Sequence, residues 1–105
     1  MYIVTNRIRV KKGFAHKMAP NFTKPGPLLD FKGFVKVEVA ISTQFEDYDE
    51  MNVNMYWESL EDFQVWRESD AFRKAHDRPS SEGESDSPLL GSQIVIQEVA
   101  STLEK

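Results

Sequence analysis

The 105-residue sequence contains no cysteine and no long apolar run. The absence of cysteine excludes a disulfide scaffold, a thiolate zinc site, an iron–sulfur cluster and a cysteine nucleophile. No apolar segment approaches the length needed to cross a bilayer, and the first ten residues are too short and too polar for the apolar core of a signal peptide. The composition therefore predicts a cytoplasmic protein without a membrane partner.

Clusters of basic residues are also missing. The formal net charge is −4, and lysine and arginine never occur in runs of more than two. This distribution argues against a nucleic-acid partner, which would require grouped positive charge. The five glycines are scattered, so there is no glycine-rich phosphate loop. Residues 1–105 are predicted to form a single domain, which leaves no room for a flavin or nicotinamide domain.

Alternating apolar and polar residues predict four β-strands. They are expected over residues 2–10, 33–43, 51–57 and 92–101. With one helix after the first strand and another after the third, the order is β-α-β-β-α-β. This order predicts the ferredoxin-like α+β fold, an antiparallel sheet with two helices. One face of such a sheet lacks a cover, and the strands are partly apolar on both faces. We therefore expect a homodimer, a dimeric α+β barrel.

The two helices have recognisable limits. The first carries an apolar stripe at Phe14, Met18 and Phe22, and Pro20 either kinks it or ends it early. The second is predicted to begin at Ser59, which has an acidic residue three positions later. A second serine–aspartate pair, Ser69-Asp70, is a candidate break within this helix. The polar stretch 77–92 is expected to be a loop.

Three residues are candidates for chemistry, each with a structural alternative. Asn6 interrupts the apolar face of the first strand, where an amide needs hydrogen-bond partners; such local exceptions tend to mark functional sites. His76 shares the inward helix face with Phe72, whereas His16 lies toward the polar side of its helix. A helix-terminal histidine is more often a cap than a ligand, and Trp66 taken alone is more often a core residue than a pocket wall.

These residues form part of a larger pattern. Residues 63–76, FQVWRESDAFRKAH, resemble the signature helix of the IsdG-type heme-degrading monooxygenases, within the antibiotic-biosynthesis-monooxygenase-like superfamily. The residues shared with that helix are Phe63, Trp66, Ser69, Phe72 and Ala75-His76. Three shorter matches are Asn6-Arg7, Gly33-Phe34 and Trp57-Glu58-Ser59. The resemblance covers nearly the whole chain. One departure from the family pattern is Pro25-Gly26-Pro27 after the first helix, a stretch that can alter the pocket entrance without touching Asn6, Trp66 or His76.

The resemblance implies a role for each candidate. His76 would be the axial ligand of heme iron, Asn6 would form a hydrogen bond on the distal side, and Trp66 would press on the porphyrin. Phe22 is expected to be a further heme contact. Neutral imidazole suits heme iron, and a single protein ligand leaves the opposite position open for dioxygen. An asparagine amide can donate a hydrogen bond without titrating.

The leading hypothesis is thus an enzyme that binds heme, receives electrons from an external reductase and opens the ring with dioxygen, releasing iron. No protein-bound flavin is expected. One alternative is a cofactor-free monooxygenase of the same superfamily that acts on an aromatic substrate. Another is a heme carrier or sensor without enzymatic activity. Added hemin would give no Soret shift with the cofactor-free monooxygenase. With the heme carrier or sensor, a reductant would leave the Soret band of the hemin complex intact.

Overall fold

A four-stranded antiparallel sheet forms the centre of the structure, a computed structural model that describes residues 1–76 and 89–105. Side chains are described for residues 1–73 and 89–105. The strands are β1 (Tyr2–Val10), β2 (Phe34–Ser42), β3 (Asp49–Trp57) and β4 (Leu89–Glu98). Their order across the sheet is β2-β3-β1-β4. The predicted ferredoxin-like α+β topology is confirmed.

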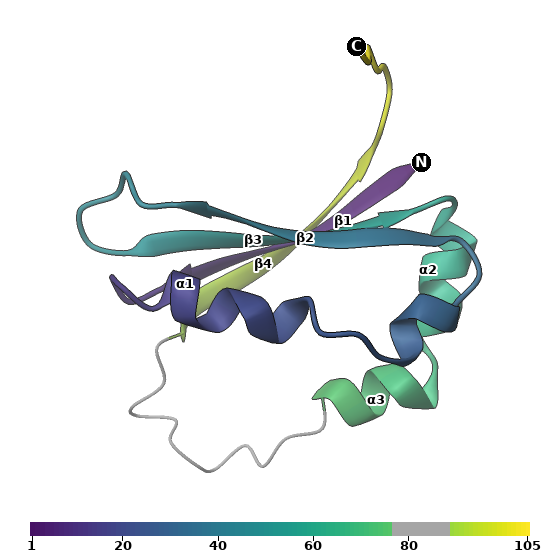
Figure 1. Ribbon diagram of the computed structural model, residues 1–105, viewed down its shortest axis with the longest axis horizontal. Coiled ribbons are helices and arrows are strands. Elements are labelled where there is room, and N and C mark those ends of the chain that lie inside the picture. Colours follow the sequence, from purple (N-terminus) through teal and green to yellow (C-terminus); the bar gives the residue numbers. More distant parts are fainter. Residues whose placement is uncertain (77–88) are drawn as a thin grey trace.

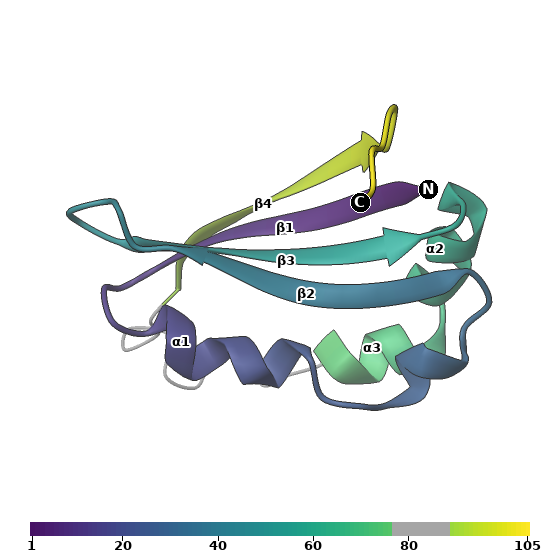
Figure 2. The ribbon, with the colours of Figure 1, turned by 45° about the horizontal axis from the view of Figure 1, so that its top comes forward.

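The helices of the described residues all lie on one face of this sheet (Figures 1 and 2). They are α1 (Ala15–Met18), α2 (Leu60–Arg67) and α3 (Asp70–His76), with 3₁₀ turns η1 (Ala19–Phe22) and η2 (Pro27–Asp30). Pro20 lies in the first turn of η1, so the first helix ends early and gives way to a 3₁₀ turn. The expected second helix is divided into α2 and α3. Within the described residues, none of these helices has the length and apolarity to span a bilayer.

The strand register determines which side chains share a face, because directly opposed residues of antiparallel strands point the same way. Asn6 of β1 is opposed by Val53 of β3 and by Ile94 of β4, and Val53 is opposed by Val39 of β2. Val53 is buried in the core. This row, Asn6 included, therefore lies on the helix-covered face, and Asn6 interrupts the apolar side of β1 as predicted.

The opposite, helix-free face carries mostly polar side chains. The Thr5 hydroxyl donates to Asn54 Oδ1 at 2.7 Å, and the Tyr56 hydroxyl donates to Glu38 at 2.9 Å. Arg7 and Glu50 form an ion pair at 3.0 Å on the same face. No described part of the chain covers this face (Figure 2).

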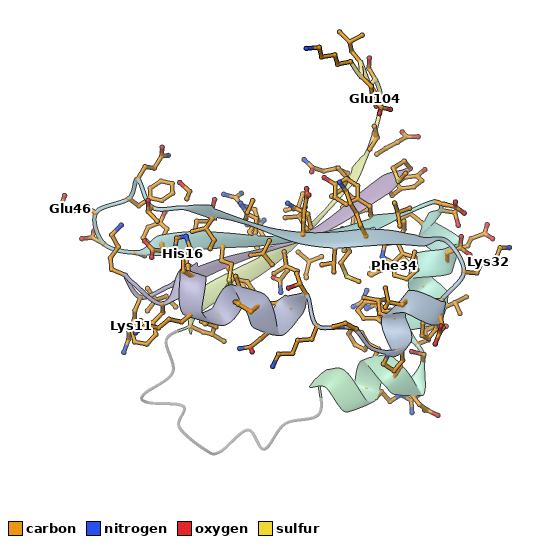
Figure 3. All side chains as sticks on the ribbon, viewed as in Figure 1. Lys11, His16, Lys32, Phe34, Glu46 and Glu104 are labelled. Atoms are coloured by element: carbon orange, nitrogen blue, oxygen red, sulfur yellow. The ribbon has the colours of Figure 1, made fainter. Side chains whose placement is uncertain are left out.

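The core between sheet and helices consists of two clusters. The first, here called the α1 cluster, comprises Ile8, Val10, Ala15, Met51 and Val53. The second, called the aromatic cluster, comprises Val4, Trp57, Phe63 and Trp66, with Phe31, Phe34 and Phe72 packed against it. Figure 3 shows Phe34 pointing from β2 into the layer between sheet and helices. Asn6 separates the two clusters along β1.

The start of α2 is held to the sheet by a close contact that requires glycine. Gly33 has a φ of +82° just before β2, a conformation that glycine adopts readily. A Cβ on Gly33 would also overlap the Asp62 side chain. The Glu58 N–H donates to the Gly33 carbonyl at 2.8 Å, and Ser59 caps α2 by accepting from the Asp62 N–H at 3.2 Å. The predicted cap is confirmed.

Two expectations about side-chain direction were wrong. Strict alternation over residues 33–43 would place Val35 on the same face as Val37, but Val35 is an exposed residue at a register shift between Phe34 and Lys36. An extra residue in one strand reverses the alternation beyond it. Phe14 was expected in the inward helical stripe, yet it precedes α1 and is exposed, while Ala15 is buried instead.

The last strand begins earlier than expected. It runs over Leu89–Glu98 rather than 92–101, because Leu89 pairs with Val10 and thus extends the ladder with β1. A register shift at Arg9/Val10 accommodates the additional residue. Residues 77–88 of the predicted loop lie outside the described part of the chain.

Candidate functional site

Asn6 lies between the two core clusters with an unsatisfied amide. Its neighbours on the same face of β1, Val4 and Ile8, belong to the aromatic cluster and the α1 cluster respectively. Its Oδ1 atom is buried and has no hydrogen-bond partner among the described residues. A buried polar atom without a partner lowers the stability of the folded state by about 1–3 kcal/mol. A ligand that bonds to the amide would explain why such an atom is present.

Trp66 lies on one side of Asn6, within the aromatic cluster. Its ring centroid is 4.8 Å from that of Phe72, in an edge-to-face arrangement, and 6.0 Å from that of Trp57. Trp66 is only 9% exposed, so it is a core residue with a small accessible remainder. The core alternative for Trp66 is thus observed, and contact with heme remains a prediction.

Phe22 lies on the other side of Asn6, at the end of η1. It packs against the α1 cluster, which includes Ile8 and Val53. The same side chain lines a hollow of about 270 Å³ beside β2, together with Pro25 and Gly26. Part of the Pro-Gly-Pro stretch, the departure from the family pattern, is therefore next to Phe22. Trp66 and Phe22 thus belong to the two different clusters that Asn6 separates along β1.

His76 is the last residue of α3, and its side chain lies outside the described part of the structure. Its role as a ligand stays a prediction. The other histidine, His16, is exposed on α1 as expected (Figure 3).

The helices that carry Trp66 and His76 meet at Ser69. Its hydroxyl donates to the Trp66 carbonyl at 2.5 Å and accepts from the Phe72 N–H at 3.2 Å. The first bond ends α2 and the second caps the start of α3. The predicted break at Ser69-Asp70 is confirmed.

Two apolar residues of β4, Ile94 and Ile96, were not identifiable from the sequence as neighbours of Asn6. Ile94 pairs with Asn6 and Ile96 pairs with Val4, so both side chains lie on the helix-covered face. They are 59% and 49% exposed, respectively, because the described helices and turns contact mainly β2 and β3. Alternation along β4 was visible in the sequence, but only the strand order brings β4 next to Asn6.

Ile94 and Ile96 present exposed apolar side chains on the same face of the sheet as the Asn6 amide. A surface of this kind, with a single polar group, fits a flat and largely apolar ligand.

A larger hollow, of about 480 Å³, is lined by Arg7, Arg9, Tyr48, Glu50, Ser92 and Gln93. Arg7 and Arg9 alternate with Asn6 along β1, so their side chains point to the opposite face. This hollow is therefore separate from the surface around Asn6.

The ionisable groups with shifted pKa values are separated from this surface, because Asp49 pairs with Val10 at the end of β1 and Tyr56 lies on the helix-free face. The Gly13 N–H and the Lys12 ammonium, each 3.0 Å from an Asp49 oxygen, lower the pKa of Asp49. The hydrogen bond to Glu38 raises the pKa of Tyr56 on the helix-free face. Since Asn6 and Trp66 do not titrate near neutral pH, they can supply hydrogen bonding and shape rather than acid–base catalysis.

Comparisons with known proteins agree on one family of enzymes. A family model described as antibiotic biosynthesis monooxygenase matches residues 1–78. A heme oxygenase (staphylobilin-producing) from Staphylococcus saprophyticus is 50% identical over 103 residues, covering 98% of this chain and 99% of the relative. A heme-degrading monooxygenase from Bacillus mycoides is 36% identical over 99 residues, covering 94% and 90%.

Solved structures share the fold. A protein from Bacillus cereus superimposes with a TM-score of 0.81 at 23% identity, covering 99% of this chain and 97% of that chain. The heme-degrader MhuD from Mycobacterium tuberculosis, solved with two hemes in its active site, gives a TM-score of 0.74 at 19% identity, covering 99% and 100%. At these identities the likeness concerns the fold alone.

Proposed function

Because the chain belongs to the antibiotic biosynthesis monooxygenase family, and within it to the IsdG-type heme-degrading monooxygenases, we propose that it binds heme and opens the porphyrin ring oxidatively, releasing the iron. Heme is the substrate, and it also supplies the iron that activates dioxygen. The name of the 50% identical relative supports a staphylobilin-type product for this chain too.

The observation that carries this proposal is the buried Oδ1 atom of Asn6, which has no partner among the described residues, beside an exposed apolar surface. Within the described residues, Ile94 and Ile96 are uncovered on the same face, and a porphyrin ring would bury them. Complete burial of an isoleucine side chain contributes about 1.5–3 kcal/mol, and these two side chains are already about half buried, so a ring that covers them would contribute part of that amount. The residues present therefore fit a ligand that is flat, apolar and larger than an amino-acid side chain.

Each site residue has a defined task in this proposal. His76, at the end of α3, provides an imidazole nitrogen to the iron. Asn6 offers its Nδ2 N–H group as a hydrogen-bond donor on the distal side, Trp66 presses its indole against the ring, and Phe22 contacts the ring from the α1 side. Ile94 and Ile96, which both lie on the helix-covered face of the sheet, exclude water from the ring.

We propose a homodimer built through the helix-free face. This face is uncovered within the described chain, and the Asn52 Oδ1 atom on it is buried without a partner. Face-to-face packing of a second sheet would cover this face and produce the dimeric α+β barrel.

The remaining parts of the proposal are one catalytic domain over residues 1–105, dioxygen as oxidant, electrons from an external reductase, and a cytoplasmic location.

Hemin titration followed by ascorbate in air tests the proposal. We expect a shifted Soret band on binding, its decay after ascorbate, and free iron detected by a chelator dye. Mass spectrometry of the product tests the staphylobilin assignment. A protein that gives no Soret shift would be the cofactor-free monooxygenase. A Soret band that persists under reductant would indicate a heme carrier.

A further inference from the structure

Ser69 makes more connections between helices than a cap requires. Its N–H and its hydroxyl both donate to the Trp66 carbonyl, at 3.0 and 2.5 Å. The hydroxyl also accepts from the Phe72 N–H at 3.2 Å, and the Ser69 carbonyl accepts from the Arg73 N–H at 3.2 Å. One residue thus bonds to the last turn of α2 and to the first turn of α3.

The two helices differ in how they are attached to the sheet. The start of α2 is bonded to the sheet through Glu58 and Gly33, and its Phe63 and Trp66 side chains are buried in the aromatic cluster. By contrast, α3 makes its main contact, within the described residues, with α2. The direction of α3 therefore depends on Ser69 and on the packing of Phe72 against Trp66.

We infer that Ser69 is a positioning residue that sets the angle between α2 and α3, and thereby the position of His76 relative to Trp66. This inference rests on the proposed function, in which these two residues contact different parts of one heme. A seven-residue helix is about 10 Å long, so a tilt of about 10° at Ser69 would displace His76 by roughly 2 Å. Displacements of this size are large for a metal ligand.

The chain contains a matched control for this inference. Ser59 caps α2 with the same chemistry, since its hydroxyl accepts from the Asp62 N–H at 3.2 Å. Its hydroxyl donates to the Asp62 side chain at 2.9 Å, within the same helix, rather than to a preceding helix. Removing either hydroxyl eliminates one cap, and typical cap losses are about 1 kcal/mol. Only the loss at Ser69 also disconnects two helices.

The experiment compares hemin binding and the ferric spectra of four variants at a temperature where circular dichroism shows each to be folded. We expect Ser69→Ala to raise the hemin dissociation constant about tenfold or more, to move the Soret band and to broaden the ferric EPR signal. Ser69→Thr, which retains the hydroxyl, should match wild type. Ser69→Gly, a tolerated cap residue, replaces the alanine variant if that variant does not fold.

Ser59→Ala should lower the melting temperature comparably and leave the hemin spectra and dissociation constant as in wild type. The inference is overturned if folded Ser69→Ala or Ser69→Gly binds hemin with wild-type affinity and spectra, or if Ser59→Ala perturbs them equally. A different result, wild-type protein that gives no Soret shift with hemin, would instead contradict the proposed function.

Discussion

Asn6 and Ile94 face each other across the β1–β4 pair on the helix-covered side of the sheet. The amide oxygen is buried without a partner, whereas the isoleucine is 59% exposed. Folded proteins usually bury isoleucine side chains and leave asparagine side chains exposed. A ligand that lies across both residues would bury the isoleucine and meet the amide, so their juxtaposition yields two separate predictions.

Ile94→Gln should weaken hemin binding without changing the empty protein. The side chain is already exposed, so the free energy of unfolding should stay within about 0.5 kcal/mol of wild type. Loss of apolar burial against the ring should raise the hemin dissociation constant roughly tenfold. Hemin titration and thermal unfolding measure the two quantities. Val65→Gln, on the outer face of α2 and 61% exposed, is the matched control, and equal weakening in both variants would contradict a ring contact.

Asn6→Ala should abolish most turnover while hemin still binds. Removing the amide eliminates an unsatisfied buried atom but leaves a small void, and these effects on the free energy of unfolding, each about 1–3 kcal/mol, oppose each other. Thermal unfolding without heme and Soret decay with reductant decide the matter. Asn52→Ala removes the other unsatisfied amide, on the opposite face, and should retain turnover. An Asn6→Ala protein that melts far below wild type but degrades heme normally would make Asn6 a structural residue.

His76→Ala should abolish heme turnover, because the iron loses its proposed protein ligand. His16→Ala should remain near wild type, since His16 is exposed on α1. Soret spectra and ascorbate-driven decay are compared for both proteins. Equal loss in the two variants, or loss in neither, would exclude His76 as the sole axial ligand.

Trp66→Phe should redirect or slow ring opening while hemin still binds. Because Trp66 is part of the core, the variant should also lose between about 0.5 and 3 kcal/mol in the free energy of unfolding. Trp57→Phe is the control, since Trp57 is fully buried in the same cluster, 6.0 Å from Trp66. Product analysis by mass spectrometry should show a change for Trp66 only. An identical product pattern and rate in both variants would leave Trp66 with a core role alone.

Asp49→Asn should remove part of the dependence of stability on acid pH. Hydrogen bonds from Gly13 and Lys12 lower the pKa of Asp49 below its ordinary value of 3.8. The unfolded state therefore takes up this proton at a higher pH than the folded state. The stabilisation is fully present above the ordinary pKa and is lost as the pH falls through the lower, folded pKa. Urea unfolding across this range should be flatter for Asp49→Asn, whereas Asp47→Asn, in an exposed turn, should follow wild type.

The strands and their faces were largely predictable from the sequence, because alternation in β1 and β3 is regular and is retained in the structure. The cap at Ser59 and the break at Ser69 were also predictable, since both depend on contacts within a few residues. The exposure of Val35 was not predictable, because the bulge at this residue is set by how β2 pairs with Trp57 and Tyr56 of β3. Pairing of this kind is a property of two segments together.

The same distinction applies to the candidate site. Asn6 could be identified from β1 alone, as a polar residue on an apolar face. Ile94 and Ile96 could not, because their significance depends on β4 lying beside β1 and on the helices leaving that edge open. The signature helix suggested Trp66, but the extent of its burial follows from Trp57, Phe63 and Phe72 around it.

The strand order also affects how the protein folds during synthesis. β1 is the first strand made and lies between β3 and β4, the last strand along the chain. The ribosome must therefore release residues 89–98 before the row through Asn6 is complete. Pairings so distant in sequence are slow to form, and until then the unpaired backbone edge of β1 is exposed to other chains. Exposed edges of this kind make partly folded chains prone to aggregation, and the surface around Asn6 exists only once β4 has been added.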